Sequence, residues 1–234
     1  MKKILAILII TITYCCKSKV ENEKSNLEND TAIDTSKITD QAKKIINDTP
    51  TKIRNFNIEY LRNNTINFSD YVQVADNEGR SQIPKEFLEN YISNKKIVIG
   101  YPEFLTSYYP ESYYFQNFKE YKNYILFTFT HFDESCCNNL YAVTSKKDSL
   151  NIINIGLIGY MGGDGGWYGE QYGFWKNDSI LKITEVSNYD EDLIEENNNT
   201  KIDTTWSKIK FDKNGVISKV EIDSISYLGN QKIQ

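Results

Sequence analysis

The chain has 234 residues, 40% of them hydrophobic, and a formal net charge of −5. This acidic balance excludes ordinary nucleic-acid binding, because a negatively charged chain repels phosphate backbones. A globular domain of this size buries about 70% of the surface of its unfolded chain, which suffices for a hydrophobic core. The composition therefore predicts a folded protein with no nucleic-acid partner.

The first sixteen residues have the pattern of an export signal. Lys2 and Lys3 precede an uncharged apolar run over residues 4–12, and Cys15 and Cys16 follow it. The run is too short to cross a bilayer as a helix, which needs about 20 apolar residues, and the chain turns polar directly after the cysteines. A basic start, a short apolar core and an early cysteine resemble the signal peptide of bacterial lipoproteins. The resemblance covers this segment alone.

In the lipoprotein family, the signal is cleaved before a cysteine that carries lipid, and here the resemblance implies Cys15, with Cys16 as the alternative. Tyr14 is bulkier than the residue that the family places before the modified cysteine, whereas Cys15 is compact. Ordinary secretory cleavage after Cys15 is a third interpretation, because Thr13 and Cys15 are small. Two or more acyl chains, such as palmitate, attach a protein durably. The resemblance therefore implies an exported, lipid-anchored protein of the bacterial cell envelope, at the outer membrane.

Composition divides the chain into three parts. Residues 1–15 are the predicted signal peptide and acylation region. Residues 16–50 are rich in Asn, Asp, Glu, Lys, Ser and Thr and poor in aromatics, so they cannot bury enough apolar surface to fold alone. We interpret them as a polar, disordered tether, in which a short helix fits residues 39–46. Residues 51–234 are predicted to form a single β-rich globular domain.

The domain contains apolar runs at strand spacing, with turn signals between them. A helix is predicted over 81–92, where Pro84 suits the first turn and apolar residues follow at helical spacing. Asn214-Gly215 is a strong hairpin signal. The predicted strands are 53–61, 96–101, 124–132, 140–144, 152–160, 172–175, 180–186, 205–211 and 216–225.

Strands joined by tight turns pair antiparallel, and their short spacing leaves no room for crossover helices. The sequence therefore predicts a mainly β fold, a β-rich α+β domain. Its core is an antiparallel β-meander that forms an open curved sheet or a small sandwich, with one or two short helices. This pattern behind a lipoprotein signal resembles the β-domains of uncharacterised bacterial lipoproteins and the strand-rich blades of propeller proteins. The chain is too short for a full propeller of four-stranded blades.

The segment 162–173 contains half of the 12 glycines of the chain, together with two acids and three aromatics. One hypothesis is a ligand-binding loop, in which the aromatic rings form a stacking platform and the carboxylates bind sugar hydroxyls. The alternative is a glycine-rich hairpin, in which the glycines supply positive φ and the aromatics cover the end of the sheet. The candidate ligand-binding residues are Asp164, Trp167, Tyr168, Glu170 and Tyr172.

Catalysis and metal binding have weaker support. Asp164 and Glu170 could pair as the two carboxylates of a glycoside hydrolase, but acid pairs are common by chance in a chain with 32 acidic residues. Calcium ligation by Asp164 is conceivable, although the segment lacks EF-hand spacing. His131 is the only histidine, so zinc centres and histidine-based triads lack their usual parts. We predict no catalytic residue, no metal site and no cofactor.

Cys136 and Cys137 are adjacent. Alpha carbons across a trans peptide bond lie about 3.8 Å apart, below the usual disulfide range of roughly 4.4 to 6.8 Å, so a vicinal disulfide would make a tight, strained turn. Free thiols are the alternative, although exported proteins favour oxidation. Both states stay open on the sequence alone.

The leading functional hypothesis is a non-enzymatic, membrane-anchored envelope lipoprotein that binds a protein or a glycan. The anchor, the tether and the lack of a catalytic constellation favour it. Two alternatives are a glycan-directed hydrolase that uses Asp164 and Glu170, and a structural subunit of an envelope complex.

Overall fold

The computed structural model of this chain describes residues 56–93, 95–100, 105, 109–133, 136–190 and 199–230. All of them belong to the second of two compact units into which the chain divides, Ile53–Gln234. The predicted signal peptide with Cys15 and Cys16, the tether and the helix over 39–46 lie outside the described residues. No helix in the described part is both long and apolar enough to span a membrane.

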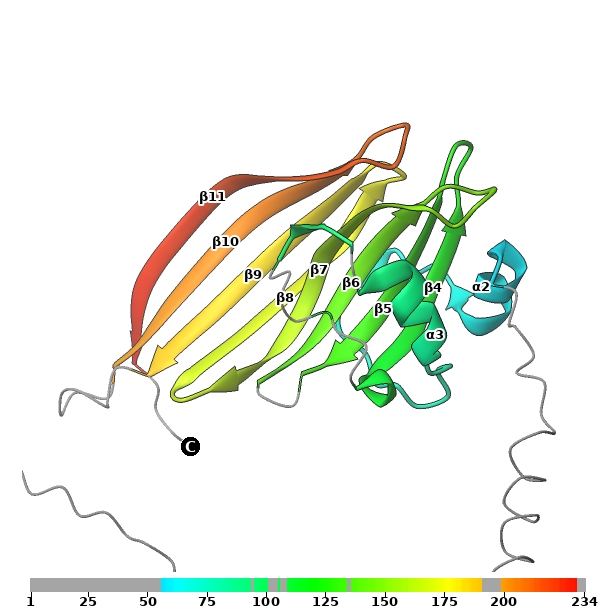
Figure 1. The fold of residues 1–234 in the computed structure, drawn as a ribbon. Helices are drawn as coiled ribbons and strands as arrows, with labels where there is room; N and C mark the ends of the chain where they lie inside the picture. Colours follow the sequence, from blue (N-terminus) through cyan, green and yellow to red (C-terminus); the bar gives the residue numbers. More distant parts are fainter. Residues whose placement is uncertain are drawn as a thin grey trace, which may run out of the picture. The chain divides into compact units, whose positions relative to one another are not determined.

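The domain is mainly β, and the predicted fold class is confirmed. An 11-stranded, mostly antiparallel meander sheet runs in the order β1-β4-β5-β6-β7-β8-β9-β10-β11, with β2 beside β8 and β3 beside β7 (Figure 1). The sheet does not close, and two short helices accompany it. The strands are β1 Ile66–Asn67, β2 Tyr71–Val72, β3 Ile97–Ile99, β4 Tyr113–Glu120, β5 Ile125–Phe132, β6 Cys137–Ser145, β7 Ile152–Asp164, β8 Trp167–Asn177, β9 Ile180–Asp190, β10 Asn199–Phe211 and β11 Ile217–Asn230.

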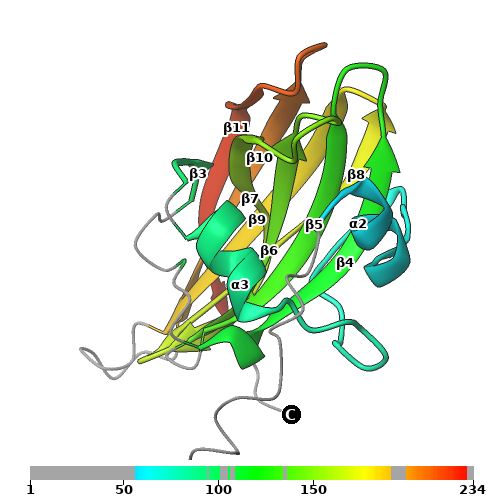
Figure 2. The ribbon, with the colours of Figure 1, turned by 45° about the vertical axis from the view of Figure 1, so that its right-hand side comes forward.

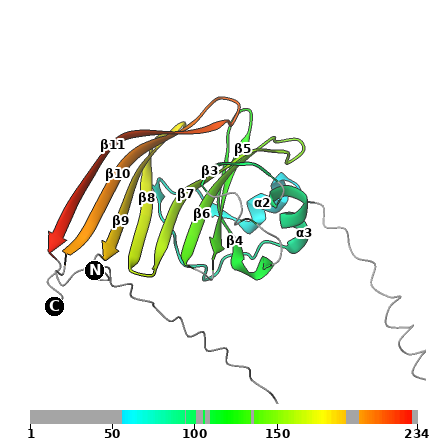
Figure 3. The ribbon, with the colours of Figure 1, turned by 60° about the vertical axis from the view of Figure 1, so that its left-hand side comes forward.

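The helices lie on one face of the first half of the sheet, strands β4–β7, as Figures 2 and 3 show. They are α2 Ile58–Asn64, α3 Lys85–Phe87 and the π-helix η1 Leu88–Ile92, and a 3-10 turn, η3 Pro110–Ser112, precedes β4. A first hydrophobic core fills the space between these helices and the sheet, with Leu61 and Phe87 from the helices and Phe127 and Val143 from the strands.

Two sequence predictions need correction here. The predicted strand over 53–61 is wrong where the structure describes it, because α2 begins at Ile58 after Asn57, whose side chain accepts a hydrogen bond from the Tyr60 amide at 2.9 Å. Such a cap satisfies an amide that a helix start otherwise leaves unpaired. The helix predicted over 81–92 begins only at Lys85, because Pro84 disfavours helical backbone before it. The preceding residues instead pair with β4.

Strands β7 and β8 are paired only near their hairpin, from Tyr160↔Gln171 to Asp164↔Trp167. Farther from the hairpin they separate, and each gains another neighbour. β3 pairs in parallel with β7, and β2 pairs antiparallel with β8. The sheet therefore divides into a first half, β4–β7, and a second half, β8–β11.

A second hydrophobic core lies between these halves. It joins Leu126 and Ala142 of the first half to Leu181 and Ile209 of the second. Because side chains alternate between the faces of a strand, Leu126 lies on the face opposite to its helix-facing neighbour Phe127. The second half therefore packs on the face of β4–β7 that the helices leave free.

The second half of the sheet has two faces, here called inner and outer. The inner face carries Gln171 and Glu185, which are paired in register, and the outer face carries Tyr168 and Phe174. Residues two apart in a strand share a face, so the register fixes the face of every paired residue in β8–β11.

Candidate functional site

A cleft of about 940 Å³ opens on the inner face, near the hairpin at which β7 and β8 are still paired. Side chains from β6, β7, β8, β9 and β11 line it, together with Ile99 and Gly100 at the end of β3 and Asp133 before β6. The cleft lies where the two halves of the sheet begin to diverge. The divergence of the two strands therefore opens this concave site.

One side of the cleft is aromatic. The rings of Tyr160 and Trp167 lie 6.1 Å apart between centroids, at an interplanar angle of 27°. Gly169 makes this arrangement possible, because an added Cβ there would lie 2.4 Å from Cζ2 of the Trp167 indole and 3.0 Å from Cε2 of Tyr160. Trp167 therefore leans over a glycine on its own strand, and the glycine positions a ring in the cleft.

Polar side chains from three strands meet beside these rings. The Tyr160 hydroxyl donates to Glu185 Oε1 at 3.1 Å, and Lys219 Nζ lies 3.3 Å from Glu185 Oε2. Lys219 Nζ also approaches Gln171 Oε1, at 3.5 Å. Gln171 is only 3% exposed, and its Nε2 has no hydrogen-bond partner in the described part of the chain. A buried amide donor without a partner costs free energy, so this group favours a ligand that accepts a hydrogen bond.

The Tyr160 hydroxyl stays protonated at neutral pH. Burial raises its pKa, and the nearby Glu185 carboxylate raises it further. Tyr160 therefore acts as a hydrogen-bond donor and not as a base. The Glu185–Lys219 pair beside it supplies an acceptor and a donor to the same cleft.

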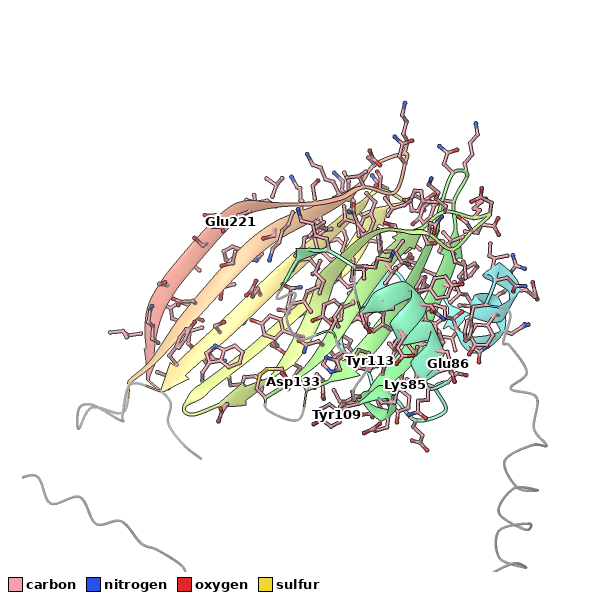
Figure 4. All side chains as sticks on the ribbon, viewed as in Figure 1. Lys85, Glu86, Tyr109, Tyr113, Asp133 and Glu221 are labelled. Carbon is pink, nitrogen blue, oxygen red and sulfur yellow. A yellow bond between two sulfur atoms is a disulfide. The ribbon has the colours of Figure 1, made fainter. Side chains whose placement is uncertain are left out.

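Cys136 and Cys137 form a disulfide bond that lines the cleft. The Asp133 carbonyl accepts hydrogen bonds from both cysteine amides, at 3.3 and 3.2 Å, and the Asp133 amide donates to the Cys137 carbonyl at 2.9 Å. Figure 4 shows the disulfide beside Asp133. An added Cβ on Gly162, which is paired with Cys137, would lie 2.3 Å from the Cys136 carbonyl oxygen. Any larger residue at position 162 would clash with the backbone of Cys136, so this part of the cleft wall requires glycine.

The five candidate residues of the glycine-rich segment do not form one site. Residues 162–173 are mostly strand, with a two-residue turn at Gly165 and Gly166, whose φ angles of 58° and 88° suit a hairpin turn of the primed type. Trp167 lies on the inner face and lines the cleft, whereas the alternating residues of β8 lie on the outer face. The outer-face candidates are Tyr168, Glu170 and Tyr172.

The stacking platform of Trp167 and Tyr168 is therefore not formed, since neighbours in a strand point to opposite faces. The same register separates Asp164 from Glu170. Asp164 is paired with Trp167 and shares its face, whereas Glu170 lies on the other one. These two carboxylates do not converge on a bond to be cleaved.

Sequence reasoning missed the polar part of the cleft. Gln171, Glu185 and Lys219 come from three strands, and only the cross-strand register brings them together. Tyr160 had been assigned to a strand, without a role in a site. A period-two alternation over residues 167–173 could have placed Gln171 on the same face as Trp167, because the two lie an even number of residues apart.

Metal binding and histidine chemistry find no support in this geometry. The described residues contain no group of three or more His, Cys, Asp or Glu side chains placed to hold a metal ion. His131 is buried and stacks on Tyr113, with ring centroids 4.3 Å apart. The disulfide leaves neither Cys136 nor Cys137 as a thiol nucleophile.

Comparisons with protein-family models, curated proteins and solved structures found no match to this chain.

Proposed function

We propose that this domain is a non-enzymatic binding module of the bacterial cell envelope, which holds a glycan in the cleft. Lipid on Cys15 or Cys16 would attach it to the membrane, as the signal-like start of the chain suggests. One observation carries the binding role. An aromatic ring, a buried amide donor without a partner and an ion pair converge in a cleft of about 940 Å³.

The size and lining of the cleft suit a small ligand. Ligand sites in proteins are concave, span about 300 to 1,000 Å³ and combine apolar walls with a few well-placed polar groups. The rings of Trp167 and Tyr160 offer faces on which the C–H groups of a sugar can pack. Glu185 can accept hydrogen bonds from sugar hydroxyls, and Gln171 can donate one to a ring or carbonyl oxygen.

The separation of Asp164 from Glu170 favours binding over hydrolysis. Glycoside hydrolases flank the scissile bond with two carboxylates on one site. In the cleft, Glu185 is instead held between Tyr160 and Lys219. We therefore assign it to hydrogen bonding with the ligand.

Replacing Trp167 with alanine is expected to weaken glycan binding by about tenfold, roughly 1.4 kcal/mol, because the ring contributes packing area and a stacking face. The measurement is calorimetric titration of the chain with soluble fragments of envelope polysaccharides, peptidoglycan included. Glu185→Gln, which removes the charge and nearly preserves the shape, is expected to weaken binding as well.

Tyr168→Ala provides the matched control, because Tyr168 is the adjacent aromatic residue and lies on the outer face. Binding by this variant should equal that of the wild type. Equal losses in Trp167→Ala and Tyr168→Ala would place the binding site elsewhere. Release of shortened glycan during the titration would overturn the non-enzymatic assignment.

A further inference from the structure

The last strand of the sheet has a long free edge. β11 pairs with β10 along its whole length, and no other described strand pairs with its outer edge (Figure 1). Its first residues are held by the rest of the domain, since Ile217 is buried and its amide donates to Asn154 Oδ1 at 2.8 Å. Lys219 is engaged in the cleft. The free part of the edge therefore begins near Val220.

This free edge is apolar on both faces. Five large hydrophobic residues of β11 are between 49% and 61% exposed. Natural edge strands are usually protected by charges or proline, yet residues 224–228 contain neither. The acids of this strand, Glu221 and Asp223, come before that stretch. The exposed hydrophobic residues are Val220, Ile222, Ile225, Tyr227 and Leu228.

A second copy of the same strand can pair with such an edge only in certain registers. Directly opposite residues of antiparallel strands point to the same face of the sheet. A two-fold axis perpendicular to the sheet leaves every side chain on its original face. Opposite residues must therefore be an even number of positions apart in the sequence, so one residue lies directly opposite its own copy. Each possible register is therefore named by the residue on the axis.

Charge disfavours the registers near the acids. An axis at Glu221 or at Asp223 sets a carboxylate directly opposite its own copy. The bulge at Ile222 puts Glu221 and Asp223 on opposite faces, so regular antiparallel pairing of two copies is confined to the residues from Asp223 onward. Like charges in directly opposite positions destabilise a strand pair, so the two-fold axis must lie farther along β11.

An axis at Ile225 avoids this repulsion and sets an apolar residue opposite its own copy. Ile225 then lies opposite its own copy, and Ser224 lies opposite Ser226 of the second copy. The carboxylate of Asp223 meets the uncharged ring of Tyr227. No like charges face each other in this register.

We propose that two copies of this chain associate by antiparallel pairing of their β11 strands, with Ile225 on the two-fold axis. The main-chain hydrogen bonds of the free edges hold the copies together, as in other strand-addition complexes. The two sheets then form one continuous sheet, and the exposed apolar residues of β11 gain cross-strand partners.

Cysteine cross-linking tests the register directly. Opposite residues of antiparallel strands have alpha carbons about 4.5 to 5.5 Å apart, within the range of a disulfide. The full chain with Ile225→Cys should therefore give a covalent dimer on mild oxidation, beyond the level of the wild-type chain, as read by non-reducing electrophoresis. The double variant Asp223→Cys, Tyr227→Cys should cross-link as well.

The single variant Tyr227→Cys is the matched control, because residue 227 is displaced from its own copy by four residues, about 13 Å along the strand. It should stay at the wild-type level. Ile225→Lys, an exposed substitution, should yield a monomer in sedimentation while the folded circular dichroism spectrum persists. A monomeric wild-type chain, or stronger cross-linking through Ser226→Cys than through Ile225→Cys, would overturn the proposal.

Discussion

Between pH 6.5 and pH 4, the free energy of unfolding is expected to fall by about 3 kcal/mol more in the wild-type chain than in a His131→Phe variant. His131 is only 6% exposed, and burial lowers its pKa from 6.5 to about 4. The carboxylate of Asp133 raises the pKa, but burial has the larger effect. The buried imidazole therefore stays neutral in the folded protein at pH values where the unfolded chain carries a proton there.

The sign of the effect follows from proton binding. Above pH 6.5, His131 is neutral in both states and contributes no pH dependence. As the pH falls below 6.5, the unfolded chain binds a proton at His131 and the folded chain does not, so the unfolded state is stabilised. Below about pH 4 the folded state also binds the proton, so His131 lowers the free energy of unfolding no further.

Urea unfolding at a series of pH values measures this effect as the difference between the two chains. Phenylalanine keeps the stacking on Tyr113 and removes the buried Nδ1 atom, which has no hydrogen-bond partner in the described part of the protein. The other acid-titrating groups are shared by both chains and cancel in the difference. Parallel pH profiles would show that His131 does not remain neutral in the folded protein.

Replacing Phe87 with alanine is expected to lower the free energy of unfolding by about 3 to 5 kcal/mol, the usual range for a buried phenylalanine. Phe87 is fully buried in the first core. Its ring centroid lies 6.4 Å from that of Tyr60 in α2, 4.9 Å from that of Tyr91 in η1 and 5.3 Å from that of Phe115 in β4. The ring therefore connects both helices to β4, and its loss leaves a cavity between the helices and the sheet.

Phe174→Ala is the control, because Phe174 lies on the outer face and is 50% exposed. This substitution should change the free energy of unfolding by no more than about 0.5 kcal/mol, as for most surface substitutions. Hydrogen exchange should locate the damage in Phe87→Ala, with faster exchange in α2, α3 and η1 than in β9 and β10. Similar losses of stability in the two variants would contradict the assignment of Phe87 as the link between helices and sheet.

The fold class could be predicted because its signals are local. At the β10–β11 turn, Gly215 has a φ of 83°, and Asp212 Oδ1 accepts hydrogen bonds from the amides of Asn214 and Val216. Such turns are encoded in a few consecutive residues. Residues 58–61 were wrongly predicted as strand, since the partial alternation concealed the helix cap at Asn57.

The cleft could be predicted only in part. Trp167 was found because aromatics beside glycines stand out in composition. Its neighbour Tyr168 was wrongly grouped with it, because the strand geometry of β8 was not recognised within the glycine-rich segment. Glu185 and Lys219 lie 34 residues apart, and their contact depends on the register of three strands. Such long-range pairing leaves no local signal.

The connectivity of the sheet sets an order for folding. From β4 to β11, every strand pairs with the strand that follows it in the chain, so each pairing closes only a short loop and costs little chain entropy. Strands β2 and β3 differ, because their partners come much later in the chain. Tyr71 of β2 pairs with Phe174 of β8, and Ile97 of β3 pairs with Ile155 of β7. When the amino-terminal end leads, as during synthesis, β2 and β3 appear early but are among the last strands to pair. The low contact order of the meander favours its rapid formation, and β2 and β3 then dock onto a sheet that already exists.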